Sequence, residues 1–123
     1  MQTPFTTAAT AARAEGETVL ANRFTAEGRV AGKLITAALD AGYVVSVFDG
    51  EEWVGKKLSK KTEIMALLFS TDEDQLIIRD ATGNKVGWFS LVYGNAEDGS
   101  ELIADHTDNP ECMALYRAVY PDA

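Results

Sequence analysis

The sequence predicts a single α+β domain in which an antiparallel sheet of about five strands packs against helices. The chain has 123 residues, which is the size of one domain, and 46% of them are hydrophobic, enough to build a core. Short β-branched and aromatic runs are separated by tight turn signals, and stretches with helical periodicity lie before, between and after them. The expected order is α-β-β-α-β-β-β-α, with residues 26–123 forming the domain.

The first 25 residues are expected to be an N-terminal arm or a weak helix, because residues 1–17 are rich in Ala and Thr and contain Gly16. A helix is predicted from about residue 26 to 41, with a start nearer 18 as the alternative. Gly42 supplies its stop signal. Its apolar positions recur at helical spacing, at Leu20, Phe24, Ala31, Leu34 and Ala38.

Two strands and a helix are predicted next. Residues 43–48 and 52–57 are the strands, and Asp49-Gly50 is the turn between them. Trp53 is the large residue expected to be buried on the second strand. Ser59 is expected to cap a helix over residues 60–69.

Three further strands are predicted over residues 75–80, 86–93 and 101–105. The run 86–93 is apolar on both faces, so we expect it to be central in the sheet. A last helix begins with Asn109 as its N-cap and Pro110 at its first position. Met113, Tyr116, Arg117 and Tyr120 are expected to line this helix at helical spacing.

The formal charge of −8 belongs to one third of the chain, because residues 70–111 contain ten acids and two bases. These acids are expected mainly in turns, where they can gather along one rim and meet a basic partner. The alternative is that they only keep the turns solvated and block edge pairing. The residues predicted to bind a partner are Asp72, Glu73, Asp74, Asp80, Glu97, Asp98, Glu101, Asp105 and Asp108.

A secondary basic patch is predicted where four lysines fall within six residues, at Lys56, Lys57, Lys60 and Lys61. It is either a solvated loop and helix start or a contact for phosphate or an acidic partner. The acidic balance of the whole chain disfavours direct binding to nucleic acid or to anionic membranes.

No catalytic constellation stands out. Residues 50–57 match the spacing of a phosphate-binding P-loop up to its lysine, but Lys57 stands where Ser or Thr should hold magnesium. His106, with Asp105, Asp108 and Cys112, is the one alternative for a hydrolase or a metal-dependent enzyme. We expect no metal and no cofactor. The two tryptophans, at positions 53 and 88, are interpreted as core residues rather than base-stacking platforms.

Five motifs carry a resemblance to a known group of proteins: SVFDGEEW (46–53), STDED (70–74), IRDATGNKVGW (78–88), LVYGN (91–95) and IADHTDN (103–109). Together they resemble a pattern in short proteins encoded by bacteriophages and plasmids, a family without an established activity. The resemblance covers roughly residues 42–109. It implies an accessory protein of a mobile element and transfers no site residue.

These observations favour a non-enzymatic inhibitor that binds a host nucleic-acid-handling or defence complex through its acidic surface, as anti-CRISPR or DNA-mimic proteins do. The alternative is a small regulatory module that self-associates, for example as a homodimer, through its N-terminal helical region. The single cysteine and the lack of a signal-peptide pattern predict a cytoplasmic location in the host cell.

Overall fold

The structure is a computed structural model that describes residues 2–122. This part of the chain forms four helices and a five-stranded antiparallel sheet, so the predicted α+β domain is confirmed with one additional helix near the N-terminus. The helices are α1 (Pro4–Ala14), α2 (Thr18–Asp40), α3 (Lys61–Leu67) and α4 (Pro110–Val119). The strands are β1 (Val44–Phe48), β2 (Trp53–Leu58), β3 (Glu73–Arg79), β4 (Lys85–Val92) and β5 (Ile103–His106).

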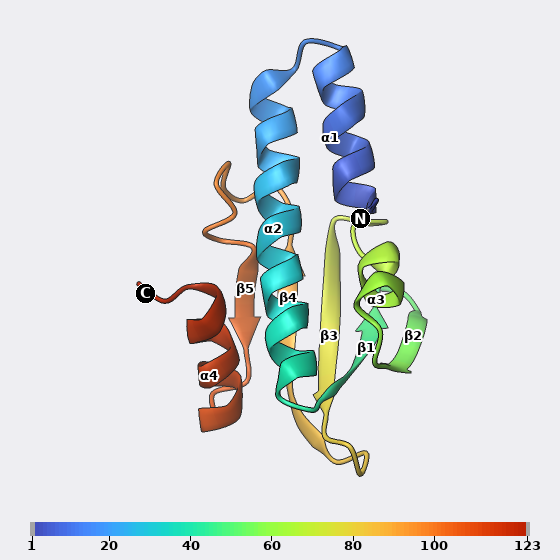
Figure 1. Ribbon diagram of the computed structural model, residues 1–123, viewed down its shortest axis with the longest axis vertical. Helices are drawn as coiled ribbons and strands as arrows, with labels where there is room; N and C mark the ends of the chain where they lie inside the picture. The colour runs from blue at the N-terminus through green and yellow to red at the C-terminus, as the bar shows by residue number, and fades with distance from the viewer. Residues whose placement is uncertain (1, 123) are drawn as a thin grey trace.

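The sheet has the strand order β2-β1-β3-β4-β5, so β4 is an inner strand, as its apolar sequence predicts. Helices α2, α3 and α4 cover one face of this sheet, and α1 packs on α2 beyond the end of the strands (Figure 1). Alternate residues of the three inner strands point toward the helices. These residues are fully buried: Val45, Val47, Leu76, Ile78, Phe89 and Leu91. In the described part of the chain no helix covers the opposite face.

The N-terminal region is more ordered than a weak arm, and the expected boundary at residue 25 falls inside α2. Thr3 caps α1 through a reciprocal pair of hydrogen bonds with Thr6, and Pro4 occupies a first-turn position that needs no N–H donor. Phe5 is fully buried and stacks on Phe69 with ring centroids 4.9 Å apart. The apolar side of α1 is therefore used within this molecule, and Val19 remains as an exposed apolar side chain near the α1–α2 turn.

Two helix predictions need correction. The residue before α3 is Lys60, and Ser59 makes no cap, so α3 begins without a side-chain hydrogen bond. In α4 the cap by Asn109 is confirmed, since its side chain accepts a hydrogen bond from the Cys112 N–H at 2.8 Å. The buried side of α4, however, holds Cys112, Leu115 and Val119. The predicted set of Met113, Tyr116, Arg117 and Tyr120 is half-buried or exposed beside it.

If α1 is an integral part of the core, Phe5→Ala will lower the free energy of unfolding by about 3–5 kcal/mol, the cost of a large buried cavity. Urea unfolding followed by circular dichroism measures this. Thr10→Ala is the matched control on the exposed side of α1, and it should change stability by less than about 0.5 kcal/mol. A Phe5→Ala loss below about 1 kcal/mol would show that α1 contributes little.

Candidate functional site on the uncovered face of the sheet

The face of the sheet that no described helix covers carries several apolar side chains among polar ones. Partners in the strand register share a face, and one row across the sheet is Ser46, Ile77 and Trp88. The next row begins with Trp53 and Phe48, whose rings meet edge to face 5.2 Å apart. Most of these side chains are half-buried by their neighbours, but Trp53 is 45% exposed. The prediction that Trp53 is a core residue is therefore wrong, because its strand lies at the edge of the sheet.

One end of the sheet gathers carboxylates from two segments. The Thr71 hydroxyl lies between two carbonyl oxygens, 2.8 Å from that of Asp49 and 2.7 Å from that of Glu73, and so joins the β1–β2 turn to the start of β3. The Asp49 carboxylate accepts the N–H groups of Glu51 and Glu52, each at 2.9 Å. These backbone hydrogen bonds lower the pKa of Asp49. We call the resulting group the acidic end, and it consists of Asp49, Glu51, Glu52, Asp72 and Glu73.

Only part of the predicted acidic rim lies there. Asp72 and Glu73 belong to the acidic end, and its other three members come from the β1–β2 turn, outside the acidic segment 70–111 of the sequence. Glu97, Asp98 and Glu101 lie in the β4–β5 connection, which leaves the sheet at this same end but runs against α2, where Gly99 packs closely. At the opposite ends of the strands lie Asp80 and Asp108, and Asp105 is on the edge strand β5.

Asp74 is fully buried, so it is not part of any exposed rim. Its Oδ2 accepts the N–H of Phe69 at 2.9 Å and also the hydroxyl of Tyr93. Phe69 has a φ of 67°, a left-handed conformation that is costly for a residue with a side chain, and the bond to Asp74 helps to hold it. Oδ1 has no hydrogen-bond partner, and burial raises the pKa of the Asp74 carboxyl.

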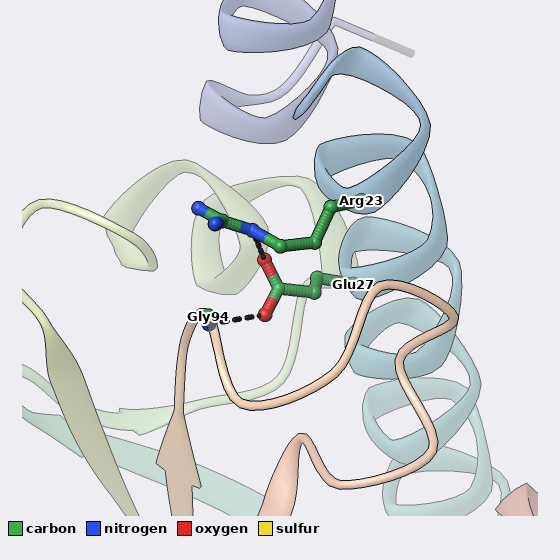
Figure 2. Close-up of polar contacts among 3 residues, drawn as sticks. All are labelled: Arg23, Glu27 and Gly94. Atoms are coloured by element: carbon green, nitrogen blue, oxygen red, sulfur yellow. Dashed lines mark hydrogen bonds and ion pairs between the residues drawn. The ribbon is translucent and has the colours of Figure 1, made fainter. Parts of the chain in front are cut away.

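The fold contains a second buried carboxylate, Glu27, that the sequence analysis missed (Figure 2). Its Oε1 lies 3.3 Å from Nε of Arg23, and its Oε2 accepts the N–H of Gly94 at 2.7 Å. Glu27 thus ties α2 to the end of β4. It lies three residues after Phe24 and four before Ala31, on the predicted apolar stripe of the helix, so this acidic residue among apolar positions was a detectable signal.

The four clustered lysines do not form one patch. Lys56 and Lys57 lie on β2, whereas Lys61 reaches the helical side and donates to the Thr36 hydroxyl at 2.8 Å. Lys60 precedes α3 and is exposed. A groove of about 710 Å³ runs along the outer side of α2, and Lys61 lines it together with Arg29 and Lys33.

A smaller hollow lies on the uncovered face of the sheet. It has a volume of about 260 Å³ and is lined by Ser46, Trp53, Lys56, Lys57 and Arg79. Three of its five lining residues are cations and one is an exposed aromatic ring. This combination suits binding rather than acid–base chemistry.

The residues weighed for catalysis are held in structural roles. The His106 ring lies between Phe89 and Tyr116, with centroids 5.4 and 5.0 Å away, and its Nδ1 is 2.9 Å from the Thr107 carbonyl oxygen. Cys112 is buried against Gly87, and burial raises the pKa of its thiol, which opposes formation of a nucleophilic thiolate. Asp105 is exposed and accepts the N–H of His106.

Within residues 2–122, no three His, Cys, Asp or Glu side chains are grouped so that they could hold a metal ion. None of the helices in the same range has the length and apolarity to cross a bilayer. No family model, curated protein or solved structure shows a significant match to the chain.

Because the folded state favours the protonated form of Asp74, the stability from this group is present below a pH of about 3.8 and is lost as pH rises toward the raised pKa. Asp74→Asn cannot lose a proton and keeps an oxygen acceptor. We therefore expect the unfolding free energy of this variant to rise relative to wild type as pH increases from 3 to 7, measured by urea unfolding. Asp72→Asn is the exposed control for removing one carboxylate. The expectation would be contradicted if the difference in unfolding free energy between wild type and Asp74→Asn stayed constant with pH.

Glu27→Ala should lower the free energy of unfolding by about 2–3 kcal/mol, because it removes the ion-pair partner of the buried Arg23 Nε and the hydrogen-bond acceptor of the Gly94 N–H. Glu27→Gln retains an acceptor for the Gly94 N–H, so its free energy of unfolding should lie between those of wild type and the alanine variant. Thermal and urea unfolding measure the series, with Glu15→Ala as the exposed control. Equal stability of all three proteins would show that this contact does not hold α2 to the sheet.

Proposed function

We propose that this protein is a non-enzymatic binding protein that docks onto the basic surface of a protein partner. The docking surface consists of the acidic end and the adjoining Trp53–Phe48 pair. The observation that carries the proposal is the hydrogen bond from Thr71 to Asp49, which brings carboxylates of two segments together beside an exposed tryptophan.

The two parts of this surface have different physical roles. An exposed aromatic side chain on a rigid strand loses little conformational entropy on binding, and tryptophan is the residue most enriched among those that dominate interface energies. Carboxylates around it attract a basic surface at long range and raise the association rate. A charged rim around an apolar centre is the usual anatomy of a protein interface.

The partner class follows from the charge. Surfaces that bind nucleic acid are rich in Lys and Arg, and carboxylates placed on them occupy the positions of phosphates. We therefore infer that the partner is a nucleic-acid-handling complex of a bacterial host and that docking competes with its nucleic acid. The resemblance to proteins of bacteriophages and plasmids supplies the setting for such an inhibitor.

The test compares affinity capture from a bacterial lysate by three forms of the protein. One is wild type, and the second carries Glu51→Lys, Glu52→Lys and Asp72→Lys in the acidic end. The third carries three equal charge reversals outside the acidic end, Glu97→Lys, Glu101→Lys and Asp108→Lys. Wild type and the third form should retain a stoichiometric partner that elutes with salt, and the acidic-end variant should lose it, because salt screens exposed charge pairs.

The captured complex is then assayed for binding to its own nucleic acid, with and without the protein. Wild type should reduce this binding and the acidic-end variant should not. Recovery of the bait alone, or equal capture by all three forms, would overturn the proposal. Thermal unfolding of each variant shows whether a loss of capture reflects a loss of fold.

A further inference from the structure

The hollow on the uncovered face is built by an irregularity in β2. Val45 pairs with Leu58 and Val47 pairs with Gly55, so two lysines of β2 stand opposite the single residue Ser46. This is a β-bulge, a device that redirects side chains at the edge of a sheet.

The second of these lysines, Lys57, has a φ of 53°, in the left-handed region that favours glycine. Its N–H donates to the Ser46 hydroxyl oxygen at 2.9 Å, which holds the bulge in place. Glycine would adopt this left-handed backbone conformation at a lower conformational free energy than lysine does. Backbone strain of this kind often accompanies a functional side chain.

Two of the cations converge at the β3–β4 turn. The Arg79 Nη1 donates to the Gly83 carbonyl oxygen at 3.3 Å, and a methyl group placed on Gly83 would lie 4.0 Å from the Lys57 Nζ. The Asp80 carboxylate beside them is turned into the hairpin, where it accepts the N–H groups of Thr82 and Asn84. Within residues 2–122 the one ion pair closer than 4.0 Å is that of Arg23 with Glu27, so the cations of the hollow have no carboxylate partner.

We propose that this hollow binds a nucleotide unit, with its base stacked on Trp53 and its phosphate between Lys57 and Arg79. Aromatic rings on a sheet surface stack on any base, and neighbouring cations hold the phosphate. A free phosphate would make no stacking contact with the tryptophan, and a neutral aromatic ligand would leave the three cations without an anion. A nucleotide unit makes both kinds of contact. The unit can belong to a free nucleotide or to single-stranded nucleic acid, which share this chemistry.

The net charge of the chain does not prevent such binding. Glu73 at the acidic end and Arg79 at the hollow are six residues apart on β3, or about 20 Å along an extended strand. Salt at physiological concentration screens exposed charges beyond about 8 Å, so the Lys57–Arg79 end of the hollow presents its own positive charge to a phosphate, although Trp53 at the other end of the hollow follows Glu52 in the chain. The sequence led to the opposite expectation from net charge, and the proposal differs from it because it considers the local charge of the hollow. The site shares Trp53 with the proposed docking surface but none of its carboxylates.

The experiment titrates the full chain with adenosine monophosphate and with a short oligothymidylate, followed by tryptophan fluorescence and by calorimetry. Adenosine and inorganic phosphate serve as the two halves of the ligand. We expect saturable quenching by at least one of the two nucleotide ligands. Adenosine and inorganic phosphate should each bind at least about tenfold more weakly than that ligand. Tighter binding of the oligothymidylate assigns the site to single-stranded nucleic acid, and tighter binding of the monophosphate assigns it to a free nucleotide.

Lys57→Gly suits the left-handed backbone and removes only the side chain, so the fold should survive. This variant and Arg79→Gln should each weaken binding about fivefold or more through the lost charged contact. Lys60→Ala, an exposed lysine outside the hollow, should leave binding unchanged. Trp53→Phe should abolish most of the quenching while calorimetry still detects the ligand.

The absence of saturable binding to the wild-type chain would overturn the proposal without any variant. Unchanged affinity in both Lys57→Gly and Arg79→Gln would also overturn it. The acidic-end variant separates the two functional proposals, because it should lose its protein partner and still bind the nucleotide ligand.

Discussion

The buried carboxylate of Glu27 is the contact on which the arrangement of helix and sheet depends. A charge inside an apolar interface is tolerated only where polar partners surround it, and here Arg23 and the N–H of Gly94 supply them. These partners belong to the same helix and to the residues just after β4, so the contact favours one position of α2 along its axis relative to the sheet. The same contact orients the connection toward β5, where Gly99 packs closely against α2.

Acidic residues of this chain have three different physical roles. Glu27 and Asp74 are buried and hold backbone N–H groups from other elements. Asp49 and Asp80 shape turns. Backbone hydrogen bonds lower the pKa of the Asp49 carboxyl, and the Thr82 hydroxyl together with backbone N–H groups lowers the pKa of the Asp80 carboxyl. The other four acids of the acidic end, Glu51, Glu52, Asp72 and Glu73, are exposed and can meet a partner. Net charge alone therefore overstates the charge that is available for recognition.

The uncovered face of the sheet carries both exposed aromatic residues and separated charges, because the two-layer fold places helices on the other face only. Every helix that packs on the sheet uses the same face, so the aromatic residues of the other face are shielded only by their neighbours. Charge is divided along the strands of this face, with carboxylates at one end and the Lys57–Arg79 pair at the other. Separation of these charges by more than a screening length lets one face present two distinct surfaces.

The sequence by itself determined the α+β class, most of the strand positions and the cap of the last helix. These features follow from period-two patterns, turn residues and the Asn109-Pro110 signal, all of which act over a few residues. It did not reveal that α1 docks through Phe5, because weak local propensity is overridden by tertiary packing of one aromatic ring. Only the tertiary structure decided which acids are exposed, that Trp53 lies on an open edge strand, and that Lys57 and Arg79 line the same hollow. Each of these depends on pairing between segments distant in the chain, and local patterns do not specify such pairing.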